Sequence, residues 1–299
     1  MHEPARKRSA TLGGMLAILL WSSLALMTVF TAALPPFEIL ALSFAIGGTC
    51  MLLLPSHAGS RLAGLRQPWP AFALAVVALF GYHALYFIAF RHAPAIEVNL
   101  VNYLWPLLIV VFASFLPGVR LLPAQIGGTL LGLLGVVFML SRGHGLSANA
   151  ADLPGYLAAL GAALTWSTYS VLNRRFHAVP SSAIGGACLA VAVLAGLTHG
   201  VFETTVAPSP GQWLVLLLMG LGPVGMAFRL WDSGTKHGDI AVLATLSYAA
   251  PLLSTLLLLC SGRVEAHWSQ AVAALLLVAP TWNSVRASMR AGAAAPGAG

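Results

Sequence analysis

Charged side chains are scarce in this 299-residue sequence, in which only 8% of residues are Asp, Glu, Lys or Arg. Soluble proteins carry about 25%, so an ordinary soluble domain is excluded. Hydrophobic residues make up 59% of the chain and the mean hydropathy is +0.86. The three cysteines stand singly in apolar stretches, without the spacing of metal ligands or of a disulfide framework. These features predict an all-α membrane protein that needs no metal and no cofactor.

Catalytic signatures are also missing. The sequence contains neither HExxH nor GxSxG, so we do not expect an enzyme. No carboxylate falls at the centre of a predicted span, although proton-coupled drug antiporters usually need one in their cavity. Phosphorylated solutes would need several buried cations, and only Arg229 lies well inside a span. These absences favour a neutral or zwitterionic solute and leave its coupling to an ion open.

Apolar stretches long enough to cross a bilayer recur along almost the whole chain, each holding about 20 residues. We expect ten transmembrane helices, over 12–33, 36–55, 70–90, 94–116, 122–141, 153–174, 181–202, 212–234, 238–261 and 268–287.

Lys and Arg residues are distributed unevenly between the two sides of such a chain. With the N-terminus inside, the cytoplasmic side holds eleven of them and the opposite side holds three. The sequence therefore predicts a multi-pass protein of the cell inner membrane with both termini in the cytoplasm and a disordered tail at 291–299. Because the net charge of +7 comes from segment ends, we expect no nucleic-acid partner.

An internal repeat becomes visible when the chain is shifted by 145 residues. The shift aligns AILLWS at 17–22 with AALTWS at 162–167, and YLWPLL at 103–108 with YAAPLL at 248–253. Each half then holds five spans, over 1–142 and 153–290, with 143–152 as the linker. An odd number of spans inserts the second copy upside down, which is the inverted repeat typical of secondary transporters.

Particular motifs resemble a known family. Pro106 and Pro251 in the fourth and ninth spans, and the QxxG motif that begins at Gln125, are similar to the drug/metabolite transporter superfamily and its ten-span EamA-type exporters. The stretches FGYHALYF at 80–87 and NLVNYLWPLLIV at 99–110 resemble the YddG-type exporters of aromatic amino acids. One departure is Gly118-Val119, where many relatives have Gly-Glu; Glu265 stands at the equivalent place in the second half.

Aromatic and amide side chains share faces of several predicted helices and suggest one central cavity. Aromatic walls stack on a flat side chain or hold an ammonium group, and amides and hydroxyls bind the polar ends of an amino acid. The candidate substrate-binding residues are Trp21, Tyr82, His83, Tyr86, Asn99, Asn102, Tyr103, Trp105, Trp166, Arg229 and Tyr248.

Each candidate also has a purely structural interpretation. The two repeated tryptophans suit symmetric core packing, Asn99 and Asn102 suit hydrogen bonds between helices, and His83 suits a satisfied interior group. Arg229 either attracts a substrate carboxylate or pairs with Asp232, three residues later. GTLLG at 128–132 favours close helix packing or dimerisation, so monomer and dimer both stay open.

The predicted function is export of aromatic amino acids (Phe, Tyr, Trp) and similar amphiphiles across the lipid bilayer. Transport would proceed by alternating access of the two repeats, with Pro106 and Pro251 as flexing points. The alternative within the same superfamily is an exporter of drugs or metabolites with broad specificity.

Overall fold

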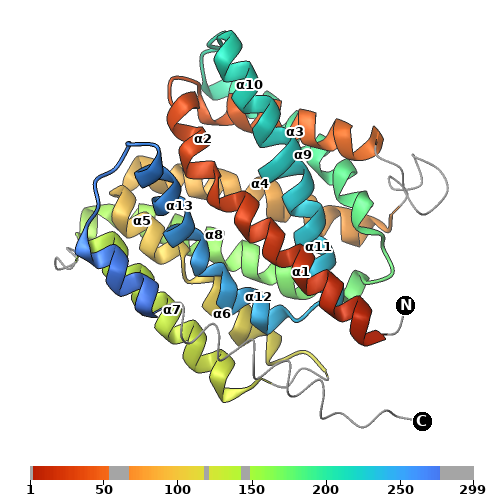
Figure 1. Ribbon diagram of the computed structural model, residues 1–299. Helices are drawn as coiled ribbons and strands as arrows, with labels where there is room; N and C mark the ends of the chain where they lie inside the picture. The colour runs from red at the N-terminus through yellow and green to blue at the C-terminus, as the bar shows by residue number, and fades with distance from the viewer. Residues whose placement is uncertain (1–2, 54–66, 118–120, 143–148, 277–299) are drawn as a thin grey trace.

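The structure, a computed structural model, describes residues 3–53, 67–117, 121–142 and 149–276, and over these residues all of its regular secondary structure is helical (Figure 1). The labelled elements are α1 (Glu3–Ser22), α2 (Leu24–Thr31), α3 (Pro36–Leu53), α4 (Trp69–His92), α5 (Ala95–Asn102), α6 (Trp105–Ala113), α7 (Pro123–Ser141), η2 (Ala150–Asp152), α8 (Leu153–Leu172), η3 (Asn173–Phe176), η4 (Ser181–Ala183), α9 (Ile184–Phe202), α10 (Pro210–Met219), η5 (Gly220–Met226), α11 (Ala227–His237), α12 (Ile240–Ser247) and α13 (Ala249–Cys260).

Eight helices or helix pairs among the described residues are long and apolar enough to cross a membrane. They match eight of the ten expected spans. The sixth expected span is α8, a helix of 20 residues that is not among the eight because Trp166 to Ser170 interrupt its apolar run. The tenth is helical over 268–276. Four predicted features lie outside the described residues: the rest of the tenth span, Gly118-Val119, most of the linker, and the tail at 291–299.

The fourth and ninth spans are each broken near the middle. α5 ends at Asn102 and α6 begins at Trp105, while α12 ends at Ser247 and α13 begins at Ala249. Pro106 and Pro251 explain the breaks, because proline has no N–H to donate to the carbonyl four residues earlier. The intervening residues Tyr103 and Tyr248 are 145 positions apart, so both breaks fall at the same place in the sequence repeat.

The eighth span contains a π-helical turn, η5, between α10 and α11. Pro223 lies inside it, and Gly220 and Gly225 flank the proline. A Cβ on Gly47 of α3 would lie 2.7 Å from the Gly220 carbonyl oxygen and 3.0 Å from the Gly225 nitrogen. Glycine on both sides therefore lets two helix backbones touch at the π-helical turn.

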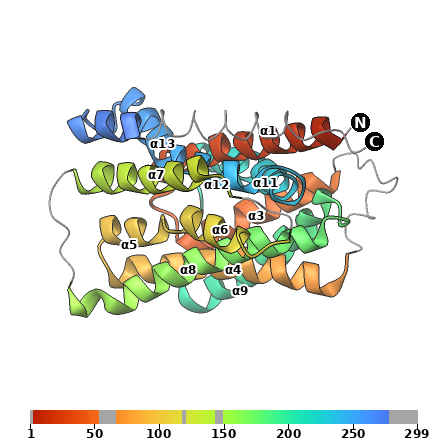
Figure 2. The same ribbon diagram turned by 90° about the horizontal axis from the view of Figure 1, so that it is seen from below.

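Each half of the chain packs mainly against the other half. α3 lies along α9, α4 along α8, and α1 along α11. Under the 145-residue shift, α4 corresponds to α10–α11 and α8 corresponds to α1. The α4–α8 contact in one half-to-half interface is therefore equivalent to the α11–α1 contact. Figure 2 shows α1, α4, α7 and α8 running in the same general direction, as spans of one bilayer would.

A local hydrogen bond also recurs in both halves. The Gln125 side-chain oxygen accepts from the Leu122 N–H at 2.9 Å, and the Gln270 oxygen accepts from the His267 N–H at 3.0 Å. Each glutamine satisfies a free donor at the start of its helix. The two glutamines are 145 residues apart, so the shared Gln motif builds the same cap twice.

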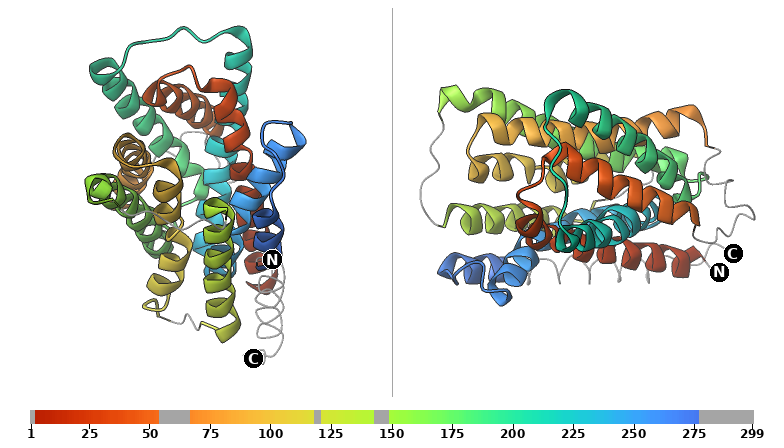
Figure 3. Two further views of the ribbon diagram at one scale, coloured as in Figure 1. Left: turned by 90° about the vertical axis from the view of Figure 1, so that its left-hand side faces the viewer. Right: turned by 90° about the horizontal axis from the view of Figure 1, so that it is seen from above.

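The connection between α9 and α10 passes over the start of α3 (Figure 3). The Glu203 carboxylate accepts from the backbone N–H groups of Phe37 and Glu38, at 3.1 and 3.3 Å. In return, Glu38 accepts from the Val206 N–H at 3.0 Å. His199 completes this cluster with its Nδ1 at 2.9 Å from Glu203. These acidic residues are therefore used in fixing a connection at one end of the molecule.

Candidate functional site

Four aromatic rings from α1, α8 and α11 meet where the two halves pack together. Trp21 contacts Trp166 edge to face at 5.6 Å between ring centroids, and Trp231 at 5.2 Å. Phe228 lies 5.8 Å from Trp21 and 5.9 Å from Trp166. Such distances are typical of attractive ring pairs. We call Trp21, Trp166, Phe228 and Trp231 the aromatic cluster.

Two indole N–H groups of this cluster are satisfied within the protein. Trp21 Nε1 donates to the Pro223 carbonyl oxygen in η5 at 2.9 Å, and Trp231 Nε1 donates to Ser170 Oγ at 3.1 Å. These bonds hold each ring in a defined orientation. With the N–H groups already bonded, the rings present their faces and edges for stacking rather than for polar recognition.

Helix α4 extends the cluster with phenol and imidazole rings. Tyr82 lies 5.7 Å from Trp166, and Tyr86 stacks on Tyr82 with centroids 5.7 Å apart and planes 19° apart. His83 packs edge to face on Tyr82 at 5.2 Å. Its Nδ1 is 2.6 Å from the Leu79 carbonyl oxygen, one turn back on the same helix. His83 is thus bonded at one nitrogen, as a satisfied interior group would be, while its ring still borders the tyrosines.

Amide groups from α5 join the tyrosine hydroxyls. Asn102 Nδ2 donates to the Tyr82 hydroxyl at 3.1 Å, and the Tyr86 hydroxyl donates to Asn99 Oδ1. Asn99 Nδ2 in turn donates to the Ala95 carbonyl at 2.7 Å. Asn102 is only 3% exposed, yet its Oδ1 has no hydrogen-bond partner among the described residues. A buried acceptor without a donor is destabilising, so this oxygen is available to a donor group on a ligand.

Trp105 reaches the same region from α6. Its ring contacts Trp231 edge to face at 5.8 Å, and its carbonyl oxygen accepts from Ser167 Oγ at 3.0 Å. Trp105 therefore joins the fourth span to both α8 and α11.

Two predicted residues, Tyr103 and Tyr248, lie in a neighbouring hydrophobic cluster with α7 rather than in ring contact with the tryptophans. Tyr248 is fully buried, and a Cβ on Gly132 would come within 2.6 Å of its ring. The expected close packing at the glycine-rich fifth span is therefore seen at Gly132. Pro106 and Pro251 are both buried beside the helix breaks.

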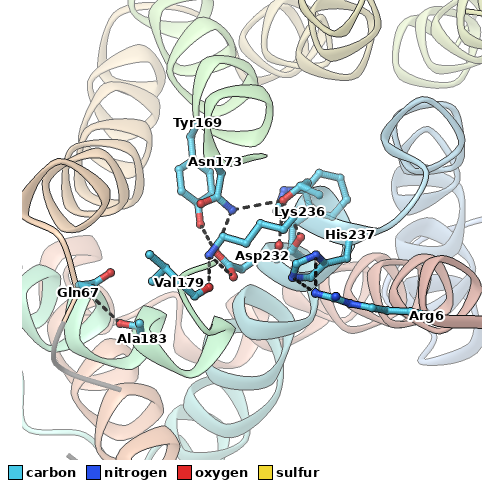
Figure 4. A network of polar contacts seen from close by, with 11 residues as sticks. Arg6, Gln67, Tyr169, Asn173, Val179, Ala183, Asp232, Lys236 and His237 are labelled. Carbon is cyan, nitrogen blue, oxygen red and sulfur yellow. Dashed lines mark hydrogen bonds and ion pairs between the residues drawn. The ribbon is translucent and has the colours of Figure 1, made fainter. Parts of the chain in front are cut away.

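Arg229 stands apart from the other candidates. It is partly exposed, and among the described residues it has no ion pair, hydrogen bond or ring contact. The alternative of a pair with Asp232 is wrong, because the Asp232 carboxylate lies 2.9 Å from Lys236 Nζ instead (Figure 4). Lys236 follows Asp232 by four residues on the same helix, and both side chains point toward the interior of the protein.

Sequence reasoning missed Phe228 and Trp231, which are central to the aromatic cluster. A signal for both was present: under the 145-residue shift, Phe228 corresponds to His83 and Trp231 to Tyr86. Carrying the aromatic face of the third span onto the eighth would have found them. Over the described part of the chain, no group of three His, Cys, Asp or Glu side chains is arranged to hold a metal ion.

Comparisons with known proteins agree on one group. A family model described as EamA-like transporter family matches residues 8–141 and 153–282. A curated relative from Ancylobacter novellus, "Aromatic amino acid exporter YddG", is 50% identical over 273 residues, covering 91% of this chain and 95% of the relative. The protein of the same name from Escherichia coli (strain K12) is 28% identical over 271 residues, covering 84% and 88%. One crystal structure superposes with a TM-score of 0.90 at 47% identity, covering 95% of this chain and 99% of the other.

Proposed function

The chain belongs to the EamA-like transporter family, and from this premise we propose that it exports aromatic amino acids and related amphiphilic metabolites. Three relatives at 28–50% identity are named as exporters of aromatic amino acids, which supports the substrate class. The multi-pass helical architecture suits a transporter of the bacterial inner membrane.

The observation that carries the proposal is the position of Asn102 Oδ1 next to the aromatic rings. The oxygen is buried and lacks a partner, while Asn102 Nδ2 holds Tyr82, whose ring contacts Trp166. An amino acid with a flat side chain offers what this arrangement lacks: its ring stacks on the tryptophans and its ammonium group donates to Asn102. Each ring pair contributes about 0.5–1.5 kcal/mol beyond burial.

The proposed binding site therefore combines the aromatic cluster with the residues of α4, α5 and α6 that border it. Tyr103 belongs to it through its position at the break between α5 and α6, and Tyr248 through the equivalent break. Arg229 is left out because, over the described residues, it has no ion pair, hydrogen bond or ring contact with the other members. The substrate carboxylate is then assigned to the Tyr82 hydroxyl, whose oxygen accepts from Asn102 and whose hydrogen is free to donate.

We further propose that two inverted repeats of five spans move past one another in alternating access. The equivalent pairs α4–α8 and α11–α1, the repeated glutamine caps and the matching breaks at Tyr103 and Tyr248 support this. Pro106 and Pro251 would act as flexing points, since each leaves a carbonyl without its helical donor. In this arrangement both termini lie in the cytoplasm.

Ligand binding to purified protein in detergent tests the proposal. Labelled phenylalanine should bind saturably and be displaced by tryptophan and tyrosine but not by aspartate. Asn102→Leu should weaken phenylalanine binding at least tenfold, because the ammonium group loses its acceptor. Asn149→Leu is the matched control, since Asn149 only caps the short turn η2 and should change nothing. Displacement by a lipophilic cation as readily as by tryptophan would instead indicate the exporter of broad specificity.

A further inference from the structure

A buried ion pair lies on α11 directly after Trp231 of the aromatic cluster. Lys236 Nζ is 2.9 Å from Asp232 Oδ2, and the two side chains are only 3% and 4% exposed. Asp232 Oδ1 accepts from Asn173 Nδ2 at 2.8 Å and from the Tyr169 hydroxyl at 3.4 Å. Lys236 also donates to the Val179 carbonyl at 3.1 Å (Figure 4). Two charges held this far from water need all of these partners, because each pays a desolvation penalty of several kcal/mol.

The pair adds charged and polar bonds between elements that pack together at this end of the molecule. Through Asn173 and Val179 it ties α11 to the end of α8 and to the segment before α9. Two further contacts lie at this end. Arg174 donates to the Thr235 carbonyl at 2.7 Å. Arg6 lies 3.1 Å from His237 (Figure 4). The first turns of α1 thus cover the same end.

The first half of the chain has no counterpart of this pair. Under the 145-residue shift, Asp232 corresponds to Phe87, Lys236 to Arg91, and Asn173 to Thr28. The second-half residues are buried, whereas Arg91 and Thr28 are exposed and Phe87 is half-buried.

The same difference holds at neighbouring equivalent positions. Phe90 is 40% exposed and its equivalent Thr235 is 0% exposed; Tyr86 is half-buried and its equivalent Trp231 is fully buried. The two ends of the molecule therefore differ at these equivalent positions: the residues around the ion pair are buried, and their counterparts at the opposite end are exposed or half-buried.

We propose that Asp232, Lys236 and Asn173 form a lock that holds the end near α1 closed and that must break in each transport cycle. This inference rests on the alternating access of the proposed function. Tyr169 links the lock to the binding site, since its ring lies 5.4 Å from the Trp166 ring while its hydroxyl reaches Asp232. Water that enters when this end opens weakens the attraction between the charges and hydrates both, so an open state is reachable once the lock separates.

A native thiol reports on the state of the lock. Cys188 of α9 is fully buried and lies beside Tyr169, in the same hydrophobic core. With Cys50 and Cys260 replaced by alanine, Cys188 is the only remaining thiol of the three in the chain. Its reaction rate with a small water-soluble thiosulfonate, measured in detergent without substrate, then reports how often water reaches this end.

The decisive variant is Asp232→Asn/Lys236→Met, which removes both charges and keeps the side-chain shapes. It should raise the Cys188 reaction rate at least tenfold. Lys7→Met is the matched control, because it breaks the Lys7–Asp239 pair at the same end, in which the Lys7 side chain is 58% exposed, and it should change the rate less than twofold. An unchanged Cys188 rate in the folded double variant would overturn the lock.

A thermal unfolding curve is measured for each variant. Cys188 reaction rates are then compared well below the melting temperature, so that a faster reaction reports opening of this end and not unfolding of the protein. If the double variant does not fold, Asn173→Ala decides, because it removes only one neutral donor to Asp232. Asn173→Ala should also raise the Cys188 reaction rate, and an unchanged rate would contradict the proposed lock. Failure of the proposed function looks different: the wild type would then carry no phenylalanine, whatever the reactivity of Cys188.

Discussion

At the scale of single residues, Trp21 and Trp166 explain why the aromatic cluster forms. They occupy equivalent positions in the two halves, and an edge-to-face contact at 5.6 Å brings α1 and α8 together. The indole N–H of Trp21 is held by the Pro223 carbonyl, so the ring cannot turn freely. A stacking surface with fixed rings loses little conformational entropy when a flat solute binds.

The Tyr82 hydroxyl gives a prediction at this scale. Tyr82→Phe removes the acceptor of Asn102 Nδ2 and leaves a second buried polar group of Asn102 without a partner. We expect a loss of about 1–3 kcal/mol in the free energy of unfolding and a rise in the phenylalanine KM of about tenfold. Tyr156→Phe is the control, because the Tyr156 hydroxyl bonds to Asp152 at 3.4 Å and to Asn149 near the start of α8, and neither residue belongs to the proposed site. An unchanged KM in Tyr82→Phe would contradict the proposed site.

Residue-level reasoning from the sequence works where a rare side chain recurs. Trp21, Trp166, Tyr82 and Asn102 were expected to line one central cavity, and the structure brings Trp21 against Trp166 and Asn102 against Tyr82. The pairing of Asp232 was not predictable from spacing alone. Asp232 has Arg229 three residues before it and Lys236 four residues after it, and both spacings allow a contact on a helix. Tertiary packing selects Lys236, because that side chain faces Val179 and the interior.

At the scale of elements, the helix breaks position the site. Asn102 is the last residue of α5 and Trp105 the first of α6, so the break at Pro106 separates an amide from an indole along one span. The π-helical turn η5 presents the Pro223 carbonyl to Trp21 in a similar way. Irregular backbone of this kind is tolerated in a membrane protein where it is buried in protein or lines a cavity.

Gly47 provides a prediction about η5. Gly47→Ala would place a Cβ against three atoms of η5, all of them backbone and none part of a flexible side chain. We expect a loss of about 1–3 kcal/mol in the free energy of unfolding, as for other overpacked sites. Gly200→Ala in α9 is the control: nothing lies within 4 Å of its added Cβ, so it should be neutral or stabilising by about 0.5–1 kcal/mol. Melting temperatures in detergent would decide, and equal values for the two variants would contradict the close approach at Gly47.

Element boundaries were only partly predictable. Hydropathy locates apolar spans, but α1 begins at Glu3 rather than near residue 12, because Ala, Arg and Lys favour helix beyond the apolar region. The breaks follow from Pro106 and Pro251. Proline alone does not distinguish a kink from the π-helical turn at Pro223, where Gly220 and Gly225 lie against Gly47 of α3.

At the scale of the whole molecule, the two ends are unlike although the halves are similar in sequence. One end is closed by the buried Asp232–Lys236 pair under the first turns of α1. The other is fastened at its margin by Glu203, which holds the α9–α10 connection on the start of α3. The repeat was predictable from rare residues at one offset, whereas the difference between the ends depends on residues that the repeat does not share.

The proposed topology, with both termini in the cytoplasm, is testable by thiol labelling of a cysteine-free background in intact cells. Thr204→Cys lies in the exposed α9–α10 connection and should react with a membrane-impermeant maleimide from outside. Arg175→Cys is exposed at the opposite end and should react only after the membrane is permeabilised. Labelling of Arg175→Cys in intact cells would contradict the cytoplasmic location of the termini.

Flux of labelled phenylalanine into liposomes that contain the purified protein tests the central claim most directly. The account predicts saturable uptake that tryptophan blocks and that threonine and aspartate leave unchanged. Uptake that ignores an imposed pH gradient would identify a passive carrier, and uptake that follows the gradient would identify proton coupling. Absence of phenylalanine uptake, together with transport of a lipophilic cation, would contradict the account and identify a drug exporter.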